Sequence, residues 1–159
     1  MSPEAARRDG SLGQGRVDVS THCTFCDIVA GRIPASLVFQ DDVCSAFMDI
    51  QPVNSGHVLV VPKQHFASLR ELEPAAGAHM FEVAQRIARA LRESTLDCEG
   101  INLFLADGAV AGQEVMHVHL HVLPRHRGDG FGLRFGPQYR QRPSRAELDM
   151  VAERIRVQL

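Results

Sequence analysis

Three histidines, His117, His119 and His121, alternate with apolar residues over positions 117–122. Because side chains alternate faces along a β-strand, this spacing predicts three imidazoles on one face, roughly 6.5–7 Å apart, and an apolar face that can pack on a helix. Burying three imidazoles costs free energy unless each is paired, so a purely structural role is the weaker interpretation. A metal centre that uses all three is an alternative, but neighbouring side chains on a flat strand diverge. We therefore favour a site that handles phosphate.

A Cys-x-x-Cys pair, Cys23 and Cys26, is the second set of residues that could do chemistry. Such a pair can bind a metal, form a redox couple or remain two buried thiols. Four cysteines in 159 residues do not suggest a disulfide scaffold, and Cys44 and Cys98 are expected to be small buried or surface thiols. The spacing alone leaves the metal, redox and structural roles open.

The rest of the sequence predicts the elements that would position these residues. The apolar pattern, the turn residues and the helix caps predict a short helix at 24–31, strands at 37–40, 43–48, 57–61, 101–105 and 115–123, a long helix at 74–95, and a C-terminal helix that starts at a Ser144–Glu147 capping box. The first two strands should form a hairpin. The fold class is therefore α+β, with a mainly antiparallel five-stranded sheet, one long helix and a C-terminal helix.

Length and charge restrict the classes of protein to which the chain can belong. Its 159 residues suffice for one domain, which we place at 22–159, behind a disordered tail at 1–21. The net charge of −2 gives no electrostatic reason to expect binding to nucleic acid or to an anionic membrane. No segment approaches the ~20 apolar residues of a membrane helix, and positions 1–19 contain no secretory h-region. We expect a cytoplasmic location.

The histidine strand and its flanking motifs resemble the histidine triad (HIT) family of nucleotide hydrolases and transferases. The shared motifs occur in the family's order and are 25–34 (FCDIVAGRIP), 47–50 (FMDI), 56–65 (GHVLVVPKQH), 111–113 (AGQ), the triad and Pro124-Arg125. The similarity extends over about residues 22–135 and is to the branch of zinc-containing purine nucleoside phosphoramidases. It implies a HIT-like fold and chemistry at the α-phosphate of a nucleotide.

The resemblance assigns catalytic roles to four residues. His119, the middle histidine, matches the family's nucleophile, whose other ring nitrogen bonds to a backbone carbonyl. His57 and His121 match residues that contact the α-phosphate, and Gln113 matches a residue that bonds to the phosphate or to the bridging atom. Imidazole suits this chemistry because it is nucleophilic when neutral near pH 7 and its bond to phosphorus is labile.

The resemblance also implies how the nucleotide is held. Asp49 matches an acid that accepts hydrogen bonds from the ribose hydroxyls, although alone it would be an ordinary strand-end aspartate. Phe25, Ile28 and Ile33 match the apolar slot for a purine base; without the resemblance we would interpret all three as core residues. His121 is expected to bind the nucleotide as well as to assist catalysis.

The loop before the triad both matches the family and departs from it. Gly108 and Gly112 match glycines that let the backbone approach the phosphate, although a plain turn would also contain them. Ala106 replaces a common Asn, whose task Asp107 could share. Glu114, assigned to the nucleotide site, replaces a common Ser or Thr near the leaving group. Because a carboxylate repels a polyphosphate but tolerates an amine, our hypothesis is that Glu114 favours phosphoramidates; a solvated Glu without effect is the alternative.

In the zinc-containing relatives, the metal binds the Cys-x-x-Cys pair, the histidine of Pro-Lys-x-His and the first triad histidine. The matching residues are Cys23, Cys26, His65 and His117. Because a Cys₂His₂ set forms a closed tetrahedral site, the resemblance implies a structural zinc ion, with His117 as a ligand and not as an acid or base. No catalytic metal or cofactor is expected.

The expected protein is therefore a phosphoramidase-like nucleotide hydrolase, and the resemblance implies a homodimer with one sheet running across both subunits. Its substrate would be a purine nucleotide with a leaving group on the α-phosphate. His119 would form a covalent nucleotidyl intermediate, which water then cleaves to release a nucleoside monophosphate. Three alternatives remain: a dinucleoside polyphosphate hydrolase or phosphorylase, a nucleotide-binding regulatory protein with little turnover, and a zinc-dependent interaction module.

Overall fold

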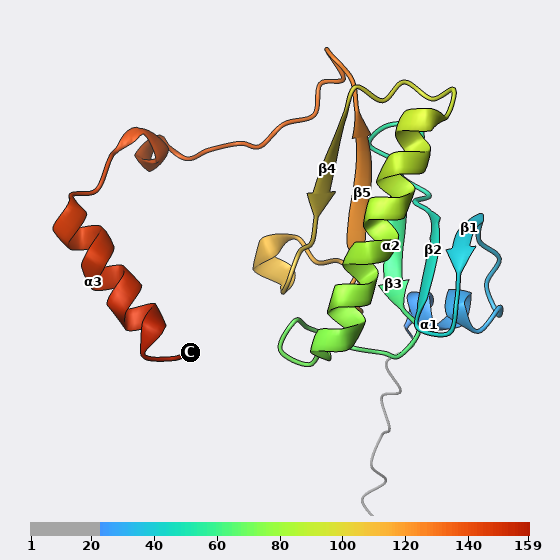
Figure 1. Ribbon diagram of the computed structural model, residues 1–159, viewed down its shortest axis with the longest axis horizontal. Helices are drawn as coiled ribbons and strands as arrows, with labels where there is room; N and C mark the ends of the chain where they lie inside the picture. Colours follow the sequence, from blue (N-terminus) through green and yellow to red (C-terminus); the bar gives the residue numbers. More distant parts are fainter. Residues whose placement is uncertain (1–22) are drawn as a thin grey trace, which may run out of the picture. The chain divides into compact units, whose positions relative to one another are not determined.

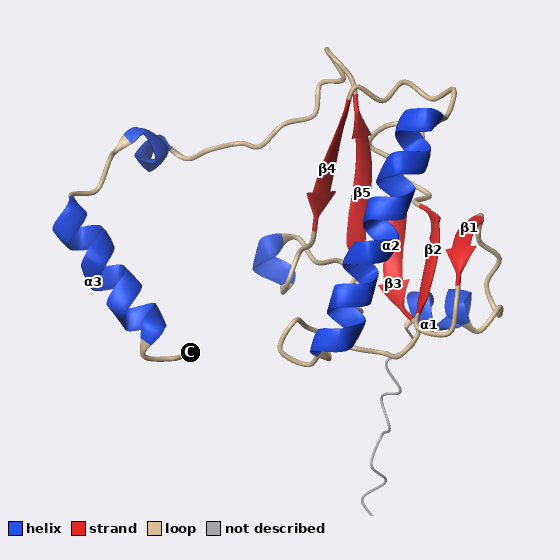
Figure 2. Ribbon diagram, in the orientation of Figure 1, coloured by secondary structure: helices blue, strands red, loops and turns tan. Residues whose placement is uncertain are grey.

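A five-stranded antiparallel sheet forms the centre of the first of two units (Figures 1 and 2). The computed structural model describes residues 23–159, and the sheet lies in the unit that ends at Arg125. Its strands, in the spatial order β1-β2-β3-β5-β4, are β1 (Leu37–Gln40), β2 (Cys44–Met48), β3 (Val58–Pro62), β4 (Gly100–Phe104) and β5 (Leu120–Arg125). The expected α+β class, the five strands and the hairpin of β1 and β2 are confirmed.

Helix α2 (Pro74–Glu93) covers one face of this sheet (Figure 1). Pro74 suits its first position, because the fixed φ is helical and the missing N–H has no helical partner there. Its buried side chains follow the helical period and are Ala76, Met80, Val83, Ala84, Ile87 and Leu91. They pack on alternate strand positions such as Val58 and Val60. The helix ends two residues earlier than expected, because Ser94 has an extended backbone.

The short helix α1 (Thr24–Val29) packs on strand residues that alternate with those under α2. The buried members of this second cluster are Phe25, Phe47, Leu59 and Val61. Cys23 caps α1, because its Sγ accepts a hydrogen bond from the backbone N–H of Cys26. The helix ends at Val29, and Gly31 follows with a φ of +72°, a conformation that glycine adopts without strain.

The triad segment differs from the prediction, because only its last part lies in the sheet. The sequence predicts a strand over 115–123, whereas β5 begins at Leu120. The N–H of His117 donates to the carbonyl of Val115 (2.8 Å), which closes a tight turn. The N–H of Val118 then donates to the carbonyl of Phe66 (2.7 Å), outside the sheet. The segment 115–119 therefore reaches the sheet through a turn and a loop contact.

The apolar residues of the triad segment lie on one face and pack under α2, as predicted. Val118 and Val122 are buried in the cluster under α2, and Leu120 packs against it. Within the sheet, His121 pairs with Leu59 of β3 on one side and with Phe104 of β4 on the other. The last triad histidine thus lies between β3 and β4, two strands that are far apart in the sequence.

The second unit spans His126–Leu159. It contains a 3₁₀ helix, η2 (Pro137–Arg140), and helix α3 (Arg145–Arg156). The expected capping box of α3 is confirmed, because the hydroxyl of Ser144 accepts from the N–H of Glu147 while the Glu147 carboxylate accepts from the N–H of Ser144.

The single domain at 22–159 stays a prediction, and the tail at 1–21 lies outside the described residues. Between positions 23 and 159, no helix combines the length and the apolar character that crossing a membrane requires.

Candidate functional site

His119 lies just before β5, with its ring buried and oriented by the backbone. Its Nδ1 lies 2.7 Å from the carbonyl oxygen of His117. A carbonyl oxygen can only accept, so in the neutral imidazole Nδ1 carries the proton and Nε2 keeps its lone pair. The rings of Phe25 and His121 contact it, with centroids at 5.2 Å and 4.9 Å. The segment therefore presents an oriented ring nitrogen with a free lone pair, as a nucleophile requires.

His57, immediately before β3, pairs with His121 of β5. Nε2 of His57 and Nδ1 of His121 are 2.9 Å apart. The backbone N–H of Val53 donates to Nδ1 of His57 (3.3 Å), so in the neutral ring Nε2 carries the proton and donates to His121. His121 then carries its own proton on Nε2. This second N–H is a hydrogen-bond donor for a ligand.

Both imidazoles of this pair are neutral at physiological pH. Burial lowers the pKa of His121 to about 4, with further contributions from the neighbouring His119 and His57, and Asp49 opposes the shift. Burial also lowers the pKa of His57, again against the opposing effect of Asp49. An anionic ligand would therefore meet the neutral Nε2–H donor of His121 and no imidazolium charge at either ring.

Asp49 follows β2 and completes this cluster. Its Oδ2 lies 3.5 Å from Nδ1 of His57, and its Oδ1 accepts from the N–H of Gln51 (2.8 Å). Donor atoms of Asp49, His57 and His121 lie within 4.8 Å of one another, as metal ligands would. However, both nitrogens of the His57 ring already have partners, Val53 and His121. The cluster therefore fits a chain of hydrogen bonds better than a metal site.

Gln113 is 4% exposed, and its side chain bonds to the protein. Oε1 accepts from the N–H of Gly108 (2.7 Å), and Nε2 donates to the carbonyls of Ala67 (2.9 Å) and Val115 (3.1 Å). Both amide protons are thus used in shaping the loop before the triad. For Gln113 to donate to a phosphate, as the sequence predicts, one of these bonds would have to open.

The other loop positions have distinct environments. Gly108 and Gly112 have φ values of +86° and +90°, where a side chain would be strained. Asp107 ties the loop to a neighbouring segment, because its Oδ1 accepts from the N–H of Leu69 (2.9 Å). Glu114 is exposed. The glycines therefore have a conformational reason to be there, and Glu114 is free to meet a ligand or solvent.

The three residues expected in the base slot differ in environment. Phe25 is buried in the α1 cluster and contacts His119. Ile28 is partly buried and packs on the same cluster, whereas Ile33 is partly buried outside it. The simpler interpretation of Phe25 as a core residue holds, and a base slot formed by these three side chains stays a prediction.

The four expected metal ligands converge on one point. Sγ of Cys23 lies 3.4 Å from Nδ1 of His117. Sγ of Cys26 lies 3.5 Å from the same nitrogen and 3.3 Å from Nδ1 of His65. All four donor atoms lie within 4.8 Å of one another. In a tetrahedral zinc site, sulfur and nitrogen ligands are about 3.5 Å apart, so the donor set and its spacing fit zinc.

The ring of His117 is oriented as a metal ligand would be. Its Nε2 donates to the carbonyl of Pro62 (2.9 Å), so the unprotonated Nδ1 faces the thiols. Burial lowers the pKa of His117, against the bond to Pro62, and so favours the neutral ring that a metal requires. Burial and the adjacent Cys23 raise the pKa of Cys26 to about 11 in the metal-free site, so a metal would displace a proton there.

Several groups that orient the side chains of the site could not be predicted from the sequence, because they are backbone groups. The N–H of Val53 sets the tautomer of His57, and the carbonyl of Pro62 sets that of His117. The carbonyl of Phe66 fixes the segment between the first two triad histidines. Any residue type supplies these groups, so no side-chain pattern could have indicated them.

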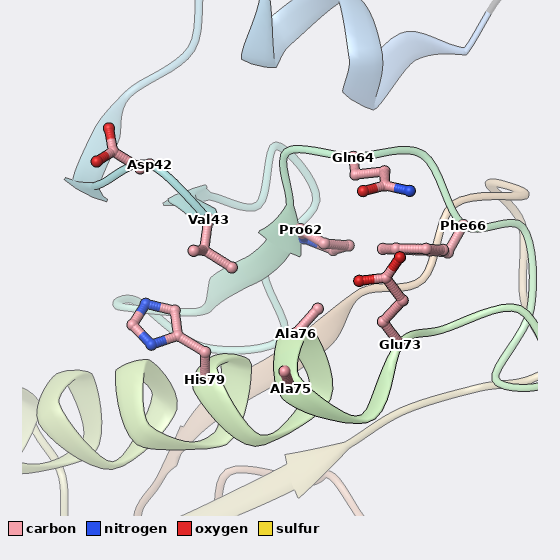
Figure 3. A pocket seen from close by; sticks show the side chains of 9 residues that line it. All are labelled: Asp42, Val43, Pro62, Gln64, Phe66, Glu73, Ala75, Ala76 and His79. Atoms are coloured by element: carbon pink, nitrogen blue, oxygen red, sulfur yellow. The ribbon is translucent and has the colours of Figure 1, made fainter.

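A separate hollow of about 440 Å³ lies beside the first turns of α2 (Figure 3). Its lining residues are Asp42, Val43, Pro62, Gln64, Phe66, Glu73, Ala75, Ala76 and His79. None of the residues predicted for the catalytic, nucleotide or metal sites lines it. The candidate site is therefore identified by its chemical groups and not by concavity.

Comparison with known proteins identifies a family model and several similar chains. A family model described as "HIT domain" matches residues 30–128. An uncharacterised HIT-like protein of Borreliella burgdorferi is 42% identical over 115 residues, 72% of this chain and 83% of the relative. Adenylylsulfatase HINT3 of Arabidopsis thaliana is 37% identical over 123 residues, covering 76% and 62%. Adenosine 5′-monophosphoramidase hnt1 of Schizosaccharomyces pombe is 34% identical over 134 residues, covering 84% and 95%.

Solved structures show the same fold. A zinc-bound histidine triad family protein from Mycobacterium smegmatis is 44% identical, with a TM-score of 0.68 over 74% of this chain and 84% of that one. A HIT family protein from Bacillus anthracis is 36% identical, with a TM-score of 0.79 over 86% and 96%. One chain similar to this one thus binds zinc.

Proposed function

Because the chain belongs to the HIT domain family, we propose that it is a nucleotide hydrolase or transferase that acts at the α-phosphate of a purine nucleotide derivative. The reaction passes through a nucleotidyl group on His119 and releases a nucleoside monophosphate. The observation that carries this proposal is the 2.7 Å hydrogen bond from Nδ1 of His119 to the carbonyl of His117, because it leaves Nε2 as the nucleophilic atom.

In the first step, Nε2 of His119 attacks the α-phosphorus, and the bond to the leaving group breaks. The leaving group takes the electron pair of that bond and, if it is an amine, a proton from water. The Nε2–H of His121 donates to an equatorial oxygen, where negative charge concentrates. His57 donates to His121 and so holds this N–H toward the phosphate.

In the second step, water attacks the same phosphorus and the Nε2–P bond breaks. The water oxygen stays on phosphorus, its proton goes to solvent, and His119 returns to a neutral ring. Throughout both steps the carbonyl of His117 accepts from Nδ1. It thereby stabilises the positive charge that the ring carries while Nε2 is bonded to phosphorus.

The names of the relatives support an adenylate with a small leaving group. One is named for an adenylylsulfatase activity and one for a monophosphoramidase activity. The exposed Glu114 adds a carboxylate at the position expected near the leaving group. It supports phosphoramidates over dinucleoside polyphosphates, because like charges repel.

We also propose that Cys23, Cys26, His65 and His117 hold a structural zinc ion. The convergence of the four donor atoms and the zinc-bound relative support it. Bound there, zinc would supply no chemistry to the reaction, because a closed four-ligand site leaves no position for substrate. It would join the start of α1 to the triad segment. The thiols that it needs are preserved in a reducing cytoplasm, where we place the protein.

A homodimer is the expected assembly. β4 lies at one edge of the sheet, and its sequence, GINLF, contains no charge that would prevent pairing with another strand. Leu103 and Phe104 are exposed at this edge. These features support a pairing of β4 with its copy in a second subunit.

Rapid quenching followed by mass spectrometry tests the proposed function. With adenosine phosphoramidate, the protein should accumulate an adenylyl group, and peptide mapping should place it on His119. His119→Ala should lose the adduct and at least about 10³-fold in turnover, while an unchanged zinc content and circular dichroism spectrum would show that the fold is kept. Equal turnover by the variant, or binding without turnover by the unmodified protein, would contradict the proposal.

A further inference from the structure

Phe25 connects the metal cluster with the nucleophile. In the sequence it lies between Cys23 and Cys26. In the structure its ring makes edge contacts with His117 (centroids 6.0 Å apart, 71° between planes) and with His119 (5.2 Å, 77°). One buried ring thus touches both a metal ligand and the nucleophile.

The position of Phe25 depends on α1, a helix too short to be stable on its own. α1 has six residues, whereas isolated helices shorter than ~12–15 residues are marginal in water. Its first turn is organised by the thiol of Cys23, whose Sγ accepts from the N–H of Cys26. Both sulfur atoms face His117. Whatever holds the two thiols together therefore also holds the ring of Phe25.

His117 makes a second connection, through its own backbone. Its Nδ1 faces the two thiols, while its carbonyl oxygen accepts the proton of Nδ1 of His119 (2.7 Å). The carbonyl and the ring belong to one residue, so a backbone shift that carries the ring toward or away from the thiols also moves the acceptor that orients the nucleophile.

From these two contacts we infer that Phe25 and His117 are positioning residues through which metal occupancy of the thiol cluster fixes the ring of His119. The inference rests on the proposed function and goes beyond a merely structural ion. With the metal bound, the carbonyl of His117 and the edge of Phe25 hold His119 in its Nδ1–H form. Without the metal, α1 loosens, and the ring of His119 samples other orientations and the other tautomer.

The predicted effect is on the chemical step and not on substrate binding. Misplacing a reacting group by about 1 Å can cost ~10²-fold in rate. Phe25→Leu keeps all four ligands but removes the aromatic edge beside His119. It should bind zinc at the same stoichiometry, with kcat about 10- to 100-fold lower and KM within about two-fold.

Phe47→Leu is the matched control. Phe47 belongs to the same buried cluster and contacts Phe25 at 5.6 Å, but within residues 23–159 no ring contact joins it to a histidine. The control should change kcat by less than about two-fold. His65→Ala removes an exposed ligand whose ring contacts His117, and should lose zinc together with the rate.

Long-range ¹⁵N–¹H spectra of the imidazoles give a readout independent of turnover. Zinc-loaded protein should show His119 as a single Nδ1–H tautomer, and Phe25→Leu, His65→Ala and chelated protein should all show a mixture. An unchanged tautomer and unchanged rate after zinc removal would overturn the inference. So would a higher KM with unchanged kcat in Phe25→Leu, because that pattern would make Phe25 a base-slot residue.

The spectra also separate this inference from the proposed function. If the unmodified protein forms no adduct on His119, the proposed function fails. The response of the His119 tautomer to zinc and to Phe25→Leu would still decide whether the metal cluster positions that ring.

Discussion

Acid should destabilise this protein through His121. In the folded state burial lowers the pKa of His121 from 6.5 to about 4. Between these two pH values the unfolded chain binds a proton that the folded chain does not. The free energy of unfolding therefore falls as pH decreases from about 6.5 toward about 4, and is fully retained above that range.

The size of the loss follows from the same two pKa values. Proton linkage with 6.5 in the unfolded chain and about 4 in the folded one gives a loss of about 2 kcal/mol between about pH 7.5 and about pH 5. The lowered pKa of His57 acts in the same direction. His121→Gln removes the titrating ring but keeps an amide that can accept the N–H of His57. The variant should lose about 2 kcal/mol less than the unmodified protein over this range.

Urea unfolding of both zinc-loaded proteins, followed by circular dichroism at the two pH values, measures this difference. Contributions of titrating groups that do not contact His121 are common to both proteins and cancel in the comparison. If the two proteins lose stability equally, within about 0.5 kcal/mol, His121 is not held neutral. The account of the His57–His121 pair as neutral donors would then be wrong.

Three further predictions concern the other parts of the chain. Cys26→Ser should bind zinc more weakly and lower Tm by about 5–10 °C at a zinc concentration that saturates the unmodified protein, to the value of chelated protein; calorimetry with and without chelator checks this. Glu114→Ser should lower the ratio of phosphoramidate to diadenosine polyphosphate turnover several-fold, and an unmoved ratio in parallel assays would assign Glu114 to solvent. Ser144→Ala removes the cap of α3 and should cost that helix about 1 kcal/mol; helical circular dichroism during a thermal scan measures it, and Ser144→Asp should restore it.

Regular patterns were the most predictable part of the fold. The long helix follows from apolar residues at helical spacing, and all five that indicate it, from Met80 to Leu91, are buried. The capping box at Ser144 is equally local, because both partners lie within one turn. These features depend on near neighbours in the sequence, which is why the sequence alone suffices to find them.

The boundary of the triad strand was less predictable, for a physical reason. Residues 117–119 begin the alternation that continues into the sheet, and Val115 and Val118 make 115–119 richer in β-branched residues than the part that enters the sheet. What removes them from the sheet is a tight turn at His117 and a bond to the carbonyl of Phe66, a partner 52 positions away. Propensity describes the segment, but a distant backbone group decides whether it has a strand neighbour.

The groups that surround the reactive atoms were predictable as residue types but not as interactions. The sequence indicates His57 and His119, yet their tautomers are set by the N–H of Val53 and the carbonyl of His117. The sequence also points to Phe25 as an apolar residue, but its contact with His119 requires α1 to be folded against the sheet. The sequence therefore indicates which residue types could react, whereas the orientation of their rings is given only by the structure.

Close packing of five imidazoles imposes a condition on the site's charge. The ring centroid of His121 lies 4.9 Å from that of His119 and 5.1 Å from that of His57. The ring centroids of His117 and His65 lie 5.0 Å apart. Protonated rings at these distances would repel one another, so the arrangement is stable only while most of the rings are neutral. Burial lowers the pKa of His57, His117 and His121 and so keeps these three rings neutral. In the proposed reaction, positive charge develops on His119 as it bonds to phosphorus, next to the anion that offsets it and to the carbonyl of His117 that accepts its remaining proton.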